Sequence, residues 1–129
     1  MLFYADFGYF KYHNRSISGA KYRPIDMGPV PDNFNTLFEM LVNEKALDVN
    51  YQTFPEGGTG EKYTPLRSFD ESLFTHDELD ILHNVKEKLK YLSTQGVIGL
   101  SHQEKAWSEN KTNKSQPIDY TYGYELNLF

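Results

Sequence analysis

The 129-residue sequence contains no cysteine, which excludes disulfide-stabilised folds, cysteine-ligated zinc, iron–sulfur clusters and thiol nucleophiles. It also lacks an apolar run long enough to span a membrane. The N-terminal segment has no basic leader and meets an acid at Asp6, so it does not resemble a signal peptide. We therefore expect a cytoplasmic protein that is not processed and does not associate with membranes.

Positive charge is scarce, because 13 Lys and Arg residues face 18 Asp and Glu residues and leave a net charge of −5. Proteins bind nucleic-acid backbones through Lys and Arg, so this chain alone is not expected to bind nucleic acid. An acidic balance favours encounter with basic proteins instead. Aromatic residues are plentiful, with ten Tyr and nine Phe. Such side chains serve both cores and interfaces, so their number does not decide between stability and recognition.

The apolar periodicity predicts an α+β fold that is mostly α-helical, a compact helical domain with a small antiparallel β-hairpin or sheet. The length fits one domain over residues 1–129. Helices are expected over residues 1–13, from 31 through 41, and over 76–93, 94–100 and 101–107. Extended segments are expected over residues 22–25, 47–52, 62–66 and 117–122, with a turn-rich connection at 55–61 that closes a hairpin.

Three local patterns predict where helices begin. Thr75 and Glu78 have the spacing of a capping box, and Ser101 and Glu104 repeat it. Pro31 suits the first residue of a helix, because its fixed φ matches the first turn and its missing N–H is not needed there.

Few residues suggest chemistry. Three glycines lie between Pro55 and Glu61, but no Gly-Lys-Ser/Thr sequence follows, so a phosphate-binding loop is not favoured. The four histidines do not form a zinc motif. His102 has three interpretations: a buried hydrogen-bonded histidine, a pH-sensitive surface group or a general base. The structural interpretation is favoured, and we expect no metal, no cofactor and no catalytic residue.

Four stretches are specific enough to suggest a family. They are LFYADF at residues 2–7, SISG at 16–19, YRPIDMGPVP at 22–31 and LSHQEKAW at 100–107. In this order and spacing they resemble the SocA-like antitoxin family, also called the Panacea domain, which is often found in prophages and other mobile elements. Residues 118–120 resemble the family's closing segment, so the likeness covers nearly the whole chain.

The resemblance implies an antitoxin of a type II toxin–antitoxin system, which neutralises a cognate protein toxin by direct binding. With the acidity of the chain, it favours a small, basic toxin. An alternative is a proteolytic adaptor that delivers the toxin to an ATP-dependent protease, and a less favoured hypothesis is a hydrolase that uses His102. Many family members carry a DNA-binding segment upstream. We expect this chain to lack that segment and the first turns of its first helix.

The resemblance also suggests roles for single residues. Gly28, Pro29 and Pro31 are expected to fix the entry into the second helix, while Ser101 and Trp107 cap and anchor the penultimate one. Gly19 is a further structural position of the motifs. The remaining motif residues form either an internal hydrogen-bond network or part of a partner-binding surface, and the network is favoured because polar groups near a core must be paired. These residues are Tyr4, Asp6, Arg23, Asp26 and His102, together with Trp107.

Overall fold

The computed structural model describes residues 1–53, 55 and 57–129. The turn predicted at residues 55–61 therefore includes one residue, 56, outside the described part of the chain. The fold is α+β and mostly helical, with two small antiparallel sheets of two strands each, as the sequence predicted. The elements are α1 (Leu2–His13), β1 (Tyr22–Ile25), β2 (Gly28–Pro31), α2 (Phe34–Asn43), β3 (Leu47–Thr53), β4 (Thr59–Pro65), the 3₁₀ helix η1 (Glu71–Leu73), α3 (His76–Leu89), α4 (Thr94–His102), α5 (Lys105–Ser108) and the 3₁₀ helix η2 (Tyr120–Glu125).

The chain folds as two compact units. Unit 1 comprises Met1–Asp32 and Ser72–Phe129, and unit 2 comprises Asn33–Glu71. Unit 1 contains α1, the β1–β2 hairpin, α3, α4, α5 and η2. The boundary falls within η1, whose first residue, Glu71, belongs to unit 2. Unit 2 contains α2 and the β3–β4 hairpin.

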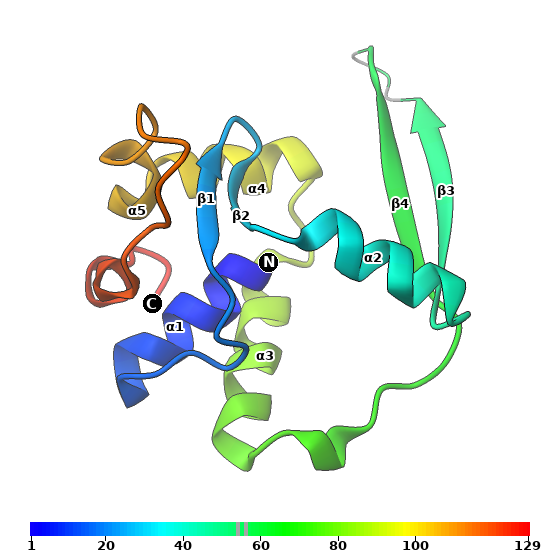
Figure 1. Ribbon diagram of the computed structural model, residues 1–129, viewed down its shortest axis with the longest axis horizontal. Helices are drawn as coiled ribbons and strands as arrows, with labels where there is room; N and C mark the ends of the chain where they lie inside the picture. The colour runs from blue at the N-terminus through cyan, green and yellow to red at the C-terminus, as the bar shows by residue number, and fades with distance from the viewer. Residues whose placement is uncertain (54, 56) are drawn as a thin grey trace. The chain divides into compact units, whose positions relative to one another are not determined.

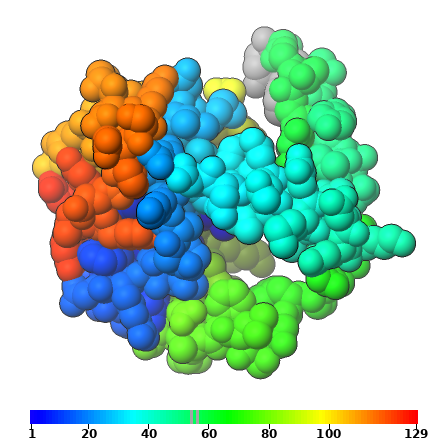
Figure 2. All heavy atoms as spheres, in the orientation of Figure 1, coloured from blue at the N-terminus to red at the C-terminus, as the bar shows by residue number. Residues whose placement is uncertain are grey.

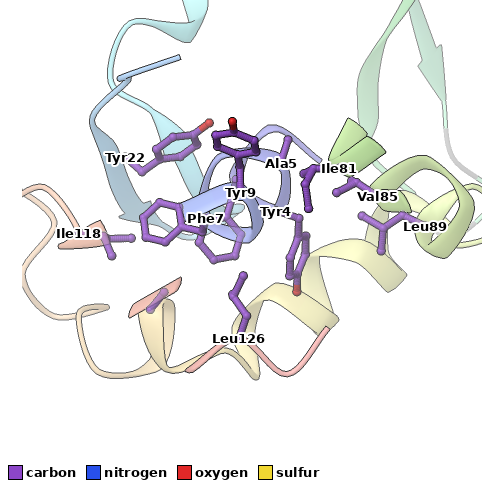
Figure 3. Packing of buried hydrophobic residues seen from close by; sticks show 12 residues of the cluster. Tyr4, Ala5, Phe7, Tyr9, Tyr22, Ile81, Val85, Leu89, Ile118 and Leu126 are labelled. Atoms are coloured by element: carbon purple, nitrogen blue, oxygen red, sulfur yellow. The ribbon is translucent and has the colours of Figure 1, made fainter. Parts of the chain in front are cut away.

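Helix α1 is the centre of unit 1. It packs against α3 on one side and against the C-terminal segment with η2 on another (Figure 1). The sequence predicted an amphipathic helix here. Every residue from Phe3 to Tyr9 is buried, so this part of the helix is instead enclosed on all sides. Phe7 is fully buried and stacks on Tyr120 at 4.5 Å between ring centroids. Figure 3 shows the buried rings of Tyr4, Phe7, Tyr9 and Tyr22 beside the α3 residues Ile81, Val85 and Leu89.

Local turn and cap chemistry places two elements where they were predicted. Strands β3 and β4 form the expected hairpin, with a register that runs from Leu47 opposite Pro65 to Thr53 opposite Thr59. Thr75 caps α3, and its side chain accepts a hydrogen bond of 3.2 Å from the backbone N–H of Glu78.

The prediction of a helix that begins at Pro31 is wrong. Pro31 is the last residue of β2, opposite Tyr22 of β1, and the helix begins three residues later at Phe34. The fixed φ of proline suits a strand at a sheet edge as well as a first helical turn, because neither position needs the missing N–H. Pairing with β1 decides between the two, and Gly28, Pro29 and Pro31 therefore shape a hairpin rather than a helix entry.

Two further expectations are corrected near the C-terminus. Ser101 is not a helix cap: it lies inside α4, and its Oγ donates to the carbonyl of Ile98 at 2.8 Å. The final segment is not a strand, because Asp119 accepts a hydrogen bond of 2.8 Å from the N–H of Thr121 and so begins η2. Before η2 begins, the backbone N–H of Ile118 donates a hydrogen bond of 2.9 Å to the carbonyl of Tyr22 in β1.

Unit 2 has very little interior of its own. Helix α2 packs on the β3–β4 hairpin, where Phe38 stacks on Tyr63 at 4.6 Å between ring centroids. No residue of α2 is buried, and among the described residues of the unit only Ala46 is. Figure 2 shows α2, in cyan, open to the viewer along its length. The sequence predicted this amphipathic helix, but its apolar face stays largely in contact with solvent.

Candidate functional site

The motif residue Asp6 is the acceptor of a buried hydrogen-bond network on α1. Its carboxylate is only 4% exposed. It accepts hydrogen bonds from the backbone N–H of Ser18 at 2.8 Å and from the hydroxyls of Ser18 and Tyr22, both at 2.6 Å. Burial raises the pKa of Tyr22, and the charge of Asp6 raises it further. The carboxylate thus ties the connection between α1 and β1 to the core.

A second buried carboxylate, Glu104, holds the C-terminal tail. It is 1% exposed and accepts hydrogen bonds from the hydroxyl of Tyr4 at 3.3 Å and from the backbone N–H groups of Asn127 and Leu128 at 2.8 and 3.3 Å. Burial, followed by the charge of Glu104, raises the pKa of Tyr4. The sequence assigned Glu104 to a capping box and missed this role, because its partners lie far away along the chain.

Two other motif residues hold the β1–β2 hairpin. The indole Nε1–H of Trp107 donates to the carbonyl of Ile25 at 2.8 Å, and Nε2 of His102 lies 2.9 Å from the carbonyl oxygen of Asp26. The two rings stack at 3.7 Å between centroids and 14° between planes. A carbonyl oxygen only accepts hydrogen bonds, so Nε2 of His102 carries a proton in this arrangement. That nitrogen is a donor to the hairpin and is not placed as a general base.

Charged side chains surround this hairpin. Lys114 pairs with Asp26 at 2.6 Å and holds the pKa of that carboxyl below its usual value. Arg23 binds Asp32 through two nitrogens, at 2.7 and 3.0 Å, and also donates to the carbonyl of Ser115. The contacts of Lys114 and Ser115 fasten the loop that follows α5 to the turn of the hairpin and to β1.

Glycine is required where β2 approaches α4. Gly28 has a φ of 106°, and a Cβ built there would lie 2.5 Å from Oγ of Ser101. The motif residues Gly28 and Ser101 are thus brought into contact, whereas Gly19, with a φ of 72°, has open space around it.

The structure therefore brings some predicted residues together and separates others. Asp26, His102 and Trp107 meet at the hairpin turn, and Arg23 lies on the same hairpin. Tyr4 and Asp6 lie on α1 in two different buried networks. Within the described residues, no group of three or more His, Asp or Glu side chains is placed to hold a metal ion. In the same part of the chain, no helix is both long and apolar enough to cross a membrane.

Comparison with known families identifies the family of this chain. Residues 1–108, from the N-terminus to the end of α5, match the family described as Antitoxin SocA-like, Panacea domain. The chain belongs to this SocA-like, Panacea domain family. No curated protein and no solved structure matches it. The Panacea region contains both buried carboxylates, and Glu104 within it binds tail residues that lie beyond the matched segment.

Proposed function

We propose that this chain is the antitoxin of a type II toxin–antitoxin system, which neutralises a small, basic protein toxin by direct binding. The observation that carries the proposal is the Panacea family match over residues 1–108. The geometry supports a binding scaffold, since the buried polar groups of unit 1 are used in holding segments of the chain together. The two buried carboxylates, Asp6 and Glu104, each accept three hydrogen bonds within the protein.

Neutralisation of this kind breaks no covalent bond. The antitoxin covers the surface that the toxin needs for its activity, and the free energy of the interface supplies the inhibition. The net charge of −5 favours rapid encounter with a basic partner at low ionic strength.

The proposal is tested by co-expression. Each open reading frame that flanks the gene in its host is placed under one inducible promoter, and the chain is placed under another. We expect one neighbour to arrest growth alone, growth to recover with the chain, and the two proteins to co-purify in a stable ratio. Asp80→Ala, which changes an exposed residue of α3, is the matched control and should protect equally. The proposal is overturned if no neighbour is toxic, or if protection occurs without a complex.

The same strains separate neutralisation from the adaptor alternative. Toxin abundance is followed by immunoblot with and without each ATP-dependent protease of the host. We expect protection to persist when the proteases are deleted, because binding alone suffices. If deletion of one protease abolishes protection and raises toxin abundance, the adaptor function, which delivers the toxin for degradation, replaces the neutralisation proposal.

A further inference from the structure

Unit 2 contains a groove between α2 and the β3–β4 hairpin. It has a volume of about 260 Å³, and its walls include Phe38 and Val42 of α2, Tyr51 of β3 and Tyr63 of β4. Glu39 is the charged residue among those that line it. The groove thus combines aromatic surface with one carboxylate.

The aromatic rings offer faces to a ligand. Phe38 and Tyr63 stack at an interplanar angle of 26°, while Tyr51 is 76% exposed. The hydroxyl of Tyr63 donates to Glu61, which raises the pKa of Tyr63 to about 12. Its ring therefore stays neutral at physiological pH. Neutral tyrosine and phenylalanine faces attract lysine and arginine side chains.

The charge of unit 2 points to the same ligand chemistry. Residues 33–71 contain seven Asp and Glu residues and three Lys and Arg residues, so this segment carries a net charge of −4 out of −5 for the whole chain. Within the described part of the chain, Glu39 makes no ion pair. An acidic segment with an aromatic groove complements a basic protein surface.

We propose that this groove takes a lysine or arginine side chain of the protein toxin. Glu39 pairs with the cation, and the rings of Tyr51, Tyr63 and Phe38 contact its stem and charge. The inference rests on the proposed antitoxin function, since that function supplies a basic protein partner. It assigns recognition to unit 2 rather than to the Panacea motif residues of unit 1.

The first test uses a basic peptide as the probe. The full ¹⁵N-labelled chain is titrated with the blocked hexapeptide acetyl-GRGGRG-amide and, separately, with acetyl-GEGGEG-amide. We expect the arginine peptide alone to shift the amide resonances of Glu39, Tyr51 and Tyr63, with binding that weakens as salt rises. Shifts that scatter over both units, or that are equal for the two peptides, would overturn the proposal.

Two variants separate the groove from bulk charge. Glu39→Gln removes the carboxylate from the groove, and Glu44→Gln removes the same charge from the end of α2, outside it. We expect Glu39→Gln to weaken peptide binding about fivefold to tenfold, and Glu44→Gln to weaken it less than about twofold. Equal effects would mean that only the overall charge matters, and the groove would carry no specific role.

The toxin assay distinguishes this inference from the proposed function. Tyr51→Ala changes an exposed side chain and should leave the circular dichroism spectrum unchanged, while it and Glu39→Gln each weaken toxin binding at least about fivefold. If both variants bind the toxin as the wild type does, the groove inference fails and the antitoxin function stands. Sedimentation experiments on the wild type and the two variants test a second copy as the occupant. If the wild type forms a concentration-dependent dimer that Glu39→Gln and Tyr51→Ala weaken, the inference is overturned.

Discussion

The substitution Asp6→Ala tests whether the buried carboxylate of α1 is structural. It removes the acceptor of three hydrogen bonds, from the N–H and hydroxyl of Ser18 and from the hydroxyl of Tyr22. Tyr22 is 1% exposed, so its hydroxyl would lose its partner away from water. A hydrogen bond to a charged group contributes about 1.5–3 kcal/mol, and a stranded buried donor costs about 1–3 kcal/mol. Since Ser18 can recover part of its loss through solvent, we expect unfolding to become easier by about 3–5 kcal/mol.

The assay is urea unfolding followed by tryptophan fluorescence. Trp107 is the single tryptophan of the chain and lies in unit 1 with Asp6, so its emission reports on the unit that the substitution perturbs. A typical domain has only about 5–15 kcal/mol of stability, so a loss of this size is a large and readily measured part of the total. Tyr22→Phe keeps the packing and removes one bond, which gives a milder loss of about 1–2 kcal/mol.

The control is Asp80→Ala on α3, where the side chain is 62% exposed and lies 3.7 Å from His76. Exposed ion pairs contribute little, so this change should alter stability by less than about 1 kcal/mol. A loss below about 1 kcal/mol for Asp6→Ala would refute the argument, because it would mean that the three hydrogen bonds are replaced by water or are not formed.

Four further substitutions test other parts of the fold. Gly28→Ala should destabilise unit 1 by about 1–3 kcal/mol in urea unfolding, because of its positive φ and its approach to Ser101, whereas Gly99→Ala, with open space around it, should stabilise the protein by up to about 1 kcal/mol. Glu61→Gln should lower the pKa of Tyr63 from about 12 toward 10.0 in a titration at 295 nm, and an unchanged pKa would contradict the hydrogen bond. The bonds from Thr121 hold the pKa of Asp119 below 3.8, so this carboxylate stabilises the fold above that pH and loses its effect as pH falls through the lowered value. The Tm of Asp119→Ala should therefore lie below that of the wild type at pH 7, and the gap should close below about pH 4.

Elements that depend on neighbouring residues were predicted well from the sequence. The start of α3 follows from Thr75 and Glu78, which are three residues apart. The β3–β4 hairpin follows from strand alternation over residues 47–52, the extended stretch at 62–66 and the glycine-rich turn between them. In both, the residues that determine the structure lie within one or two turns of chain, so a local pattern contains the information.

Elements that depend on distant partners were not predictable in this way. Pro31 is compatible with a helix start and with a strand, and only β1 decides. Glu104 fits a capping box by its spacing, but its carboxylate instead meets Tyr4, a hundred residues earlier, and the tail at Asn127. Among the candidate site residues, the motifs pointed to Asp26, His102 and Trp107, which do meet. They gave no indication of the groove around Glu39, because it forms only when α2 packs on two strands.

Substitution of the buried Asp6 and of the surface residue Glu39 should distinguish an effect on stability from an effect on toxin binding. Asp6 is buried with three donors, so Asp6→Ala would abolish toxin binding only by unfolding unit 1, and the loss of binding would follow the unfolded fraction. Glu39 lies at the surface without an ion pair in the described part of the chain, so Glu39→Gln should leave the urea midpoint unchanged while it weakens binding. Measuring both quantities for both variants therefore distinguishes a scaffold residue from a contact residue, even before the structure of a complex is known.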